Sequence, residues 1–541
     1  MTGMLSMSQA VSEAFKARCI QADINVNLHA VIEEAARTHP DGVAWHFIAD
    51  GSEITYVQLA AATRSVASGL LELGIQAGDR VAVMLPNRPE FPLAWLSIGR
   101  IGAVMVPVNV GYTSREVAYV LADSGATNLI TTSDLAERLS GDAETRDLLA
   151  SIALIVVDEG FSRSVRWGDL ASTDEALLPE VSPEALVNIQ YTSGTTGFPK
   201  GCMLTHDYWL VLSAVTAARL NFEAQNVLVA QPFFYMDPQW LLMMAIRVRG
   251  TLFVAEKMST TRFMEWVRRF RIEFCSFPDL LAKAPARPDD RDHSLRHVVV
   301  YGLPKQLHAE MEERFGFVAR EGYGMTEVGS AIISPFELED VVGTGSCGIA
   351  SPFRELSIRD PDGNALPDGQ EGELWVRGRS IMQGYWKRPD ANAEVFREGG
   401  WFRTGDLFRK DADGLYYITG RIKDMIRRSN ENIAAREVEA VSLSMAGVKE
   451  AAALGVPDEV RGEEVKIYLV TDTAAGADES FVDGYIRHCR QNLAPFKVPR
   501  FIELRSELPK TSSDKVAKHV LRSERPDLRT GAFDRVDNLW R

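Results

Sequence analysis

One short segment of this sequence has the composition of a phosphate-binding loop. Residues 191–201 read YTSGTTGFPKG and directly follow the apolar run ALVNIQ. Small hydroxyl residues and glycines leave backbone N–H groups open and let a polyphosphate approach closely, and Lys200 adds a mobile cation. The spacing is not that of a Walker A loop, which requires G-x-x-x-x-G-K-[ST]. The segment favours a nucleotide-binding loop of another class, although the same composition is also typical of a solvated turn.

Alternating strand and helix signals position this loop. Between Asp79 and Asn109 a β-branched run, RVAVML, is followed by a helical stretch, PLAWLSIGRIG, and by a second apolar run, AVMVPVN. This order is typical of a parallel βαβ unit. Thr113 and Glu116 then have the spacing of a capping box before an amphipathic helix. We therefore predict an α/β protein with a large layered domain.

The character of the sequence changes after Gly420. The stretch RIKDMIRRSNEN is polar and basic, and a compact series of helix and strand signals follows it. A chain of 541 residues is also too long for one compact core. We predict a large N-terminal domain over residues 1–420, a small α+β domain over 421–541, and an irregular tail from Ser523.

Composition restricts the classes of partner and compartment. The net charge is -15 and the pI is near 5.3, whereas binding to nucleic acid or to an anionic membrane needs a basic footprint. The five cysteines lie far apart and are odd in number, which argues against a disulfide framework or a thiolate zinc site. The start lacks a leader pattern and no stretch has the length of a membrane span, so we expect a cytoplasmic protein.

Seven ordered motifs resemble the adenylate-forming superfamily of acyl-CoA synthetases, carrier-protein adenylation domains and luciferases. They are YTSGTTGFPKG at 191–201, YGMTE at 323–327, GELWVRG at 372–378, WFRTGD at 401–406, GRIKDMI at 420–426, NENIAAREVE at 430–439 and LPKTSSDK at 508–515. The sequence as a whole is most similar to those of crotonobetaine/carnitine-CoA ligases. The resemblance implies that ATP, with Mg²⁺, converts a carboxylic acid to an acyl-AMP and that the acyl group then passes to coenzyme A.

The resemblance also implies roles for individual residues. Lys515 would stabilise the charge that develops when a carboxylate attacks the α-phosphate. Thr326 and Glu327 complete the catalytic set, and Glu327 would hold magnesium, which takes only one or two hard oxygen ligands from protein. Lys423 is the implied hinge of a mobile small domain. The implied nucleotide-binding residues are Thr192, Ser193, Gly194, Thr195, Thr196, Lys200, Gly322, Tyr323, Gly324, Asp406 and Arg421, with Asp406 accepting the two ribose hydroxyls.

The expected acid pocket departs from the commonest pattern of the family. Its candidate residues are Tyr235, Met236, Trp240, Gly302 and Met325. Tyr235 stands where many relatives carry histidine, and Trp240 belongs to a helical stripe that is also typical of core packing. Asp514 stands where the family has glycine before the lysine, which puts the efficiency of the first half-reaction in question. Asn430 replaces another glycine, and this departure is milder because asparagine tolerates left-handed conformations.

Two other functions compete with the acyl-CoA ligase. The chain is also compatible with a freestanding adenylation enzyme that loads a carrier protein, and with a catalytically silent relative that only holds a nucleotide or acyl ligand. His293 and His297 have the i, i+4 spacing of a metal pair but lack a third ligand nearby, so surface histidines are the better interpretation. The sequence leaves open which acid is used and whether the protein is a homodimer.

Overall fold

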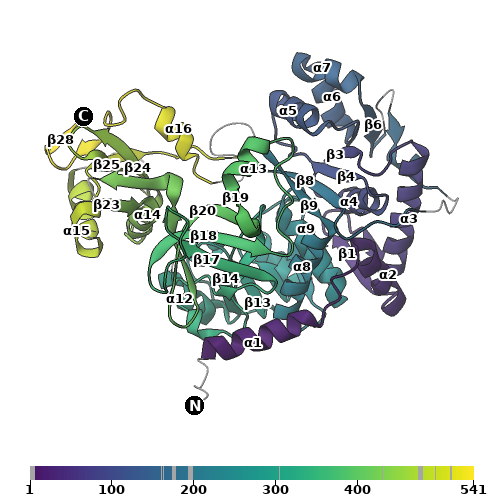
Figure 1. Cartoon of the computed structure of the whole chain (residues 1–541), viewed down its shortest axis with the longest axis horizontal. Helices are drawn as coiled ribbons and strands as arrows, with labels where there is room; N and C mark the ends of the chain where they lie inside the picture. Colours follow the sequence, from purple (N-terminus) through teal and green to yellow (C-terminus); the bar gives the residue numbers. More distant parts are fainter. Residues whose placement is uncertain are drawn as a thin grey trace.

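The computed structural model describes residues 7–159, 161, 164–172, 178–192, 199–303, 305–428, 431–472, 479–493, 495–511 and 515–541. Two large sheets form the centre of the molecule, and their parallel strands are joined by helices (Figure 1). Buried parallel strands of this kind need helices on their faces. The predicted large α/β architecture is therefore confirmed.

The first large sheet carries the strands around the predicted loop at 191–201. In spatial order it contains β7 (Val165–Arg166), β6 (Ala153–Val156), β5 (Asn128–Thr131), β3 (Arg80–Met84), β4 (Val104–Pro107), β8 (Leu186–Thr192) and β9 (Lys200–Thr205). The predicted βαβ unit is present as β3, α4 (Glu90–Arg100) and β4, and β3 pairs with β4 in parallel.

The second large sheet carries the YGMTE motif. In spatial order it contains β16 (Ile349–Ala350), β15 (Gly329–Ile333), β14 (Val318–Met325), β13 (His297–Val300), β12 (Phe274–Ser276), β10 (Asn226–Val229), β11 (Thr251–Val254), β1 (Val43–Phe47) and β2 (Glu53–Thr55). A further antiparallel sheet contains β17 (Arg354–Arg359), β18 (Glu371–Gly378), β20 (Trp401–Lys410), β19 (Phe396–Arg397) and β21 (Tyr416–Arg421).

Helices connect and cover these sheets. They are α1 (Met7–Ile20), α2 (Leu28–Thr38), α3 (Tyr56–Glu72), α4 (Glu90–Arg100), α5 (Ser114–Ser124), α6 (Ser133–Gly141), α7 (Ala143–Ala150), α8 (His206–Arg219), α9 (Met236–Val248), α10 (Phe263–Arg269), α11 (Asp279–Lys283), α12 (Lys305–Phe315) and α13 (Pro389–Val395). The predicted capping box is formed at α5, where Thr113 and Glu116 exchange both hydrogen bonds.

Helix α8 forms the centre of the hydrophobic core. Every one of its residues except Asp207 is buried, and α9, which packs against it, is buried almost all round. A helix that is apolar on all sides must be covered on all sides. Both helices therefore lie in the interior of the protein.

A separate sheet is formed by the C-terminal part of the chain (Figure 1). Its strands are β23 (Glu431–Ala434), β22 (Met425–Arg428), β25 (Gly462–Thr471), β26 (Phe501–Arg505), β27 (Phe533–Asp534), β28 (Leu539–Trp540) and β24 (Val448–Asp458), covered by α14 (Ala435–Leu443), α15 (Glu479–Asn492) and α16 (Lys518–Ser523). We call residues 425–541 the small lobe and residues 7–421 the large lobe. The tail that we predicted to be irregular instead adds β27 and β28 to this sheet.

Two ion pairs hold the tail, one within it and one to a residue distant in sequence. Asp534 is fully buried and bonds to Arg500, which lies just before β26, and to Arg541. A buried carboxylate needs such partners, and none of them can be read from local sequence pattern.

Candidate active site

The turn between β14 and β15 places Thr326 and Glu327 at the carboxyl edge of the second large sheet. Met325 lies opposite Gly329 across the turn, so the chain reverses within three residues. A Cβ at Gly324 would lie 2.5 Å from the Gly329 carbonyl oxygen, which explains the glycine there. The Tyr208 hydroxyl of α8 donates to the Thr326 carbonyl at 3.1 Å and fixes the turn on the core.

Tyr385, a residue outside the sequence motifs, contacts both Glu327 and Lys200. The Tyr385 hydroxyl donates to Glu327 Oε1 at 2.8 Å, and Lys200 Nζ lies 4.3 Å from the centroid of the same ring. Residues 383–386 run along β9, because backbone bonds join Gly201 to Trp386 and Met203 to Gly384. Burial raises the pKa of Glu327, and the Tyr385 hydroxyl and Lys200 oppose that shift.

Asp406 and Arg421 meet because they are cross-strand partners on β20 and β21. Arg421 Nε lies 2.6 Å from Asp406 Oδ1, and the Tyr323 hydroxyl donates to Asp406 Oδ2 at 2.6 Å. Asp406 is almost completely buried, whereas half of the Arg421 side chain is exposed. The carboxylate is therefore fixed in place, with a cation beside it that still reaches solvent.

A short hairpin of the small lobe presents Lys515 to the large lobe. Lys510 and Val516 form an antiparallel bridge, and Thr511 N donates to the Lys515 carbonyl at 2.7 Å. Lys515 is solvent-exposed, yet enough protein surrounds it for burial to lower its pKa. The Arg421 cation lowers that pKa further, and Asp406 and Asp237 oppose the shift. The charge of Lys515 in the small lobe therefore interacts with Asp406 and Arg421 of the large lobe.

The expected acid pocket lies around the start of α9. Tyr235 is the residue before α9 and its hydroxyl accepts from Asn109 Nδ2 at 3.2 Å, while Met236 is the first helical residue. Trp240 is 6% exposed and donates to Asp237 Oδ1 at 3.0 Å, so it packs in the core and also anchors a carboxylate. Burial raises the pKa of Asp237, and Trp240 and Lys515 oppose the shift.

Gly302 and Met325 lie at the ends of neighbouring strands. Gly302 follows β13, and its backbone N–H donates to Glu321 Oε1 on β14 at 2.9 Å. Met325 ends β14, with its sulfur 3.6 Å from the Tyr323 hydroxyl. Burial raises the pKa of Glu321 to about 7. The structure thus places both predicted residues at the edge that carries Thr326 and Glu327.

Several predicted residues fall outside the described part of the chain. These are Ser193, Gly194, Thr195 and Thr196 of the glycine-rich loop, together with Asn430 and Asp514. Thr192 and Lys200 are described at the two ends of that loop, where the Thr192 hydroxyl donates to the Lys200 carbonyl at 3.3 Å. Lys423 lies in the short 3-10 helix Ile422–Asp424 between the lobes, and only its backbone is described.

Three residues that contact or adjoin the predicted site residues were not predicted from the sequence: Tyr385, Asp237 and Glu321. Tyr385 contacts Glu327 across 58 positions of sequence, so no local spacing could have found it. Asp237 directly follows the predicted pocket residues Tyr235 and Met236, and its charge at that position was the available signal.

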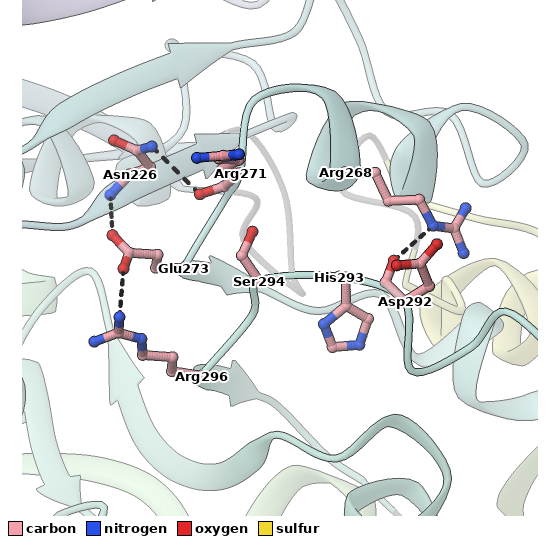
Figure 2. A pocket seen from close by; sticks show the side chains of 8 residues that line it. All are labelled: Asn226, Arg268, Arg271, Glu273, Asp292, His293, Ser294 and Arg296. Carbon is pink, nitrogen blue, oxygen red and sulfur yellow. Dashed lines mark hydrogen bonds and ion pairs between the residues drawn. The ribbon is translucent and has the colours of Figure 1, made fainter.

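The two histidines with metal-pair spacing do not form a metal site. His293 lines a hollow of about 550 Å³ with Arg268, Arg271, Glu273 and Arg296, at the edge where β10, β12 and β13 begin (Figure 2). Within the described residues, no group of three potential ligands gathers. Both histidines are partly exposed, and the hollow lies at the opposite edge of the sheet from Glu327.

The fold and the interactions that link Lys200 to Glu327 through Tyr385, and Lys515 to the Asp406–Arg421 pair, define the class of adenylate-forming enzymes. The chain belongs to the family of AMP-binding enzymes, whose sequence profile matches residues 32–386. The profile of the AMP-binding enzyme C-terminal domain matches residues 437–515.

Characterised relatives agree with this assignment. The long-chain-fatty-acid–CoA ligase of Yersinia pestis is 32% identical over 95% of this chain and 97% of its own length. The crotonobetaine/carnitine–CoA ligase of Salmonella agona is 31% identical over 87% and 93%. ATP-bound MatB of Rhodopseudomonas palustris is 28% identical, covers 93% of this chain and 100% of its own, and has a TM-score of 0.82.

A solved complex of a relative shows the expected intermediate. The o-succinylbenzoate CoA synthetase of Bacillus subtilis, with an acyl-adenylate bound, is 26% identical with a TM-score of 0.78 and covers 92% of this chain and 98% of its own. The chain is thus an AMP-forming acyl-CoA synthetase that uses ATP, Mg²⁺ and coenzyme A. No described helix combines the length and apolarity that a membrane crossing requires.

Proposed function

We propose that the cleft between the lobes carries out both half-reactions of acid–CoA ligation with the residues described above. The observation that supports this most directly is the position of Lys515. Its charge interacts with Asp406 and Arg421 of the large lobe, although it belongs to the small lobe. A single lysine that crosses between lobes suits a step at the nucleotide, where Asp406 would hold the ribose.

In the first half-reaction, a carboxylate oxygen of the acid attacks the α-phosphorus of ATP. The bond from that phosphorus to the bridging oxygen breaks, and pyrophosphate leaves with the electron pair. Two anions must approach, so the transition state needs concentrated positive charge. Lys515 supplies it at the α-phosphate, while Lys200 and the loop that it ends would hold the outer phosphates.

Glu327 has the properties that a magnesium ligand requires. It is 8% exposed, its Oε1 is held by the Tyr385 hydroxyl, and its burial is not compensated by a direct ion pair among the described residues. Mg²⁺ takes one or two carboxylates and completes its shell with phosphate oxygens and water. When bound, the ion neutralises phosphate charge; Tyr385 orients Glu327 for it.

In the second half-reaction the thiol of coenzyme A attacks the acyl carbon, and AMP leaves. Lys515 is then no longer needed, and the small lobe would rotate about Lys423, with domains at 1–420 and 421–541. Among the described residues, no hydrogen bond or ion pair joins residues 7–421 to residues 425–541. An interface without such bonds supports a lobe that moves.

The decisive experiment is a screen of carboxylic acids with ATP and Mg²⁺, with and without coenzyme A, that measures pyrophosphate and AMP. We expect acid-dependent pyrophosphate exchange and CoA-dependent AMP release. Lys515→Ala should lower exchange by about 10²–10³-fold. Lys510→Ala, which removes the other lysine of the same hairpin, should leave it unchanged.

The same screen separates the alternatives. Adenylation that proceeds only to a carrier-protein thiol would identify the freestanding carrier-loading enzyme. Silence with every acid, in both half-reactions, would contradict catalysis and favour a relative that only binds ligands. A cytoplasmic location, the absence of nucleic-acid partners and a homodimer stay predictions of the sequence.

A further inference from the structure

Asp123, near the end of α5, binds the segment that follows Tyr385. Its side chain is 11% exposed, and Arg388 Nη2 lies 2.6 Å from its Oδ1. Its backbone carbonyl also accepts from Trp386 Nε1 at 3.1 Å and from Lys387 Nζ at 2.9 Å. Three consecutive side chains after Tyr385 therefore bind a single residue of α5.

The same carboxylate contacts the strand that enters the glycine-rich loop. The Tyr191 hydroxyl donates to Asp123 Oδ2 at 2.7 Å, and Tyr191 directly precedes Thr192, the last residue of β8. Burial and the Asp123 carboxylate raise the pKa of Tyr191, so the hydroxyl keeps the proton that it donates. The two oxygens of Asp123 thus join β8 to Arg388, which is distant in sequence.

Tyr119 extends this network to the exit of the loop. It precedes Asp123 by four residues on α5, so the two side chains lie on the same face of the helix. Its hydroxyl accepts from Arg388 Nη2 at 2.8 Å and donates to the Pro199 carbonyl at 3.0 Å. The hydroxyl therefore acts as both acceptor and donor, and it fixes the chain one residue before Lys200.

Lys200 is fixed in both backbone and side chain by the same network. The Trp386 N–H donates to the Gly201 carbonyl at 2.8 Å, so the chain is also held one residue after Lys200. Lys200 Nζ lies 4.3 Å from the centroid of the Tyr385 ring. Tyr385 and Trp386 belong to the segment that Asp123 binds, so the position of the lysine depends on that carboxylate.

We propose that Asp123 is a positioning residue for the phosphates of ATP, which acts by fixing both ends of the glycine-rich loop and, with them, Lys200. This inference rests on the proposed function of Lys200 and the loop. A lysine that is already held in place loses less conformational freedom when ATP binds. Without Asp123, ATP itself would have to order the ends of the loop, which weakens its binding. The acid and the acyl-AMP carry no β- or γ-phosphate, so their binding should change far less.

The test measures the constants for ATP and for the acid in Asp123→Asn, which keeps the shape of the side chain and removes its charge. We expect the KM for ATP in pyrophosphate exchange to rise by about tenfold, and the KM for the acid to change by less than about twofold. CoA-dependent thioester formation from supplied acyl-AMP should also change by less than about twofold. Equal increases in the KM for ATP and for the acid would overturn the inference.

Tyr119→Phe keeps the test decisive if Asp123→Asn does not fold. This variant removes one hydroxyl, and with it the bond to Pro199, so the KM for ATP should rise by about threefold to tenfold. In a Lys200→Ala background the same substitution should have little further effect, because the bond acts through that lysine. Independent effects of the two substitutions would contradict the inference.

Asp290→Asn is the matched control. Asp290 pairs with Arg314 at 2.6 Å, and its side chain is 10% exposed, so this pair resembles that of Asp123 in distance and burial. Its described bonds go to Arg314 and to the Arg287 N–H, not to the ends of the glycine-rich loop. The KM for ATP should stay within about twofold of the natural value. A rise equal to that in Asp123→Asn would mean that the loss of any such ion pair suffices, and would refute the inference.

Calorimetric titration with ATP and Mg²⁺ keeps this test separate from the proposed function. If the natural chain turns over no acid, the proposed function fails, and the dissociation constant for ATP then decides. A constant that rises about tenfold in Asp123→Asn and stays unchanged in Asp290→Asn supports the inference. Equal constants for the natural chain and Asp123→Asn, or no binding of ATP to the natural chain, would refute it.

Discussion

At the scale of single residues, Asp406 shows how the cleft prepares for a ligand. One of its oxygens accepts from Tyr323 and the other contacts Arg421, so the carboxylate is fixed before a nucleotide arrives. Such pre-organisation reduces the reorganisation that binding would otherwise require. Lys515 approaches this fixed pair from the other lobe and completes the set.

The pH dependence of the first half-reaction should report Lys515. Its pKa lies below the ordinary 10.5, because burial and Arg421 disfavour the ammonium form. The first half-reaction requires the ammonium form of Lys515. The rate of pyrophosphate exchange should therefore be highest at pH values below the lowered pKa. Activity should then fall as pH rises, earlier than for a free lysine. Rates of pyrophosphate exchange measured across the alkaline range would show this decrease as the alkaline limb of the pH profile.

Lys515→Arg provides the control for that limb. Arginine stays charged over the whole range, so the residual exchange of this variant should keep its rate to higher pH. An unchanged alkaline limb in Lys515→Arg would assign the titration to another group.

Residue roles could be predicted only where a motif carries them. Glu327, Asp406 and Lys515 lie in ordered segments of the sequence, and the structure places each at the cleft. Tyr385 lies in no motif. Its bond to Glu327 exists only once distant segments have packed together.

At the scale of elements, the β13–β14 edge combines a structural bond with a titratable group. Glu321 on β14 is 8% exposed and accepts the Gly302 N–H, which fixes the loop after β13. That bond needs an acceptor oxygen but no charge. The buried charge is therefore a cost to stability that an amide would not have.

Glu321→Gln should stabilise the protein above neutral pH. The folded pKa of about 7 exceeds the ordinary 4.5, so the folded chain binds this proton more tightly than the unfolded chain does. The stability from this group is complete below about 4.5 and is lost as pH rises through about 7. The variant should gain on the order of 1–3 kcal/mol in free energy of unfolding at pH 8, and less at pH 5, by urea titration.

Glu312→Gln is a control of opposite sign. The pKa of Glu312 is lowered although burial raises it, because His308, the Ala319 N–H and Arg320 favour its charged form. Its removal should destabilise the protein at pH 8. A Glu321→Gln variant that is destabilised equally at both pH values would show that the charge of Glu321 stabilises the folded protein.

Regular elements were predictable where their pattern is local. The unit β3–α4–β4 follows the apolar runs that a parallel βαβ unit requires. The capping box of α5 follows from the spacing of Thr113 and Glu116. The pair β27 and β28 was missed because its order depends on Asp534 and two arginines far apart in sequence.

At the scale of the whole molecule, sheet membership changes between Arg421 and Met425. β21 ends in a sheet of the large lobe and β22 begins the sheet of the small lobe (Figure 1). The sequence indicated this change by its shift to polar, basic residues after Gly420. It could not indicate how the lobes meet, since that depends on surfaces from both.

The three-residue connection between the sheets should control the two half-reactions separately. Proline fixes φ near -65°, so Lys423→Pro should hinder rotation about this connection while leaving the orientation described here accessible. In this orientation Lys515 already faces Asp406 and Arg421. Acid-dependent pyrophosphate exchange should therefore change by less than about threefold, whereas CoA-dependent thioester formation from supplied acyl-AMP should fall by about tenfold or more.

Lys423→Ala tests whether the backbone or the side chain is responsible. Alanine removes the side chain and leaves φ free, so both half-reactions should proceed at nearly natural rates. Equal losses in both half-reactions for Lys423→Pro, with no difference from Lys423→Ala, would mean that the lobes need not rotate here. Loss of thioester formation alone would show that one orientation of the small lobe cannot complete both steps.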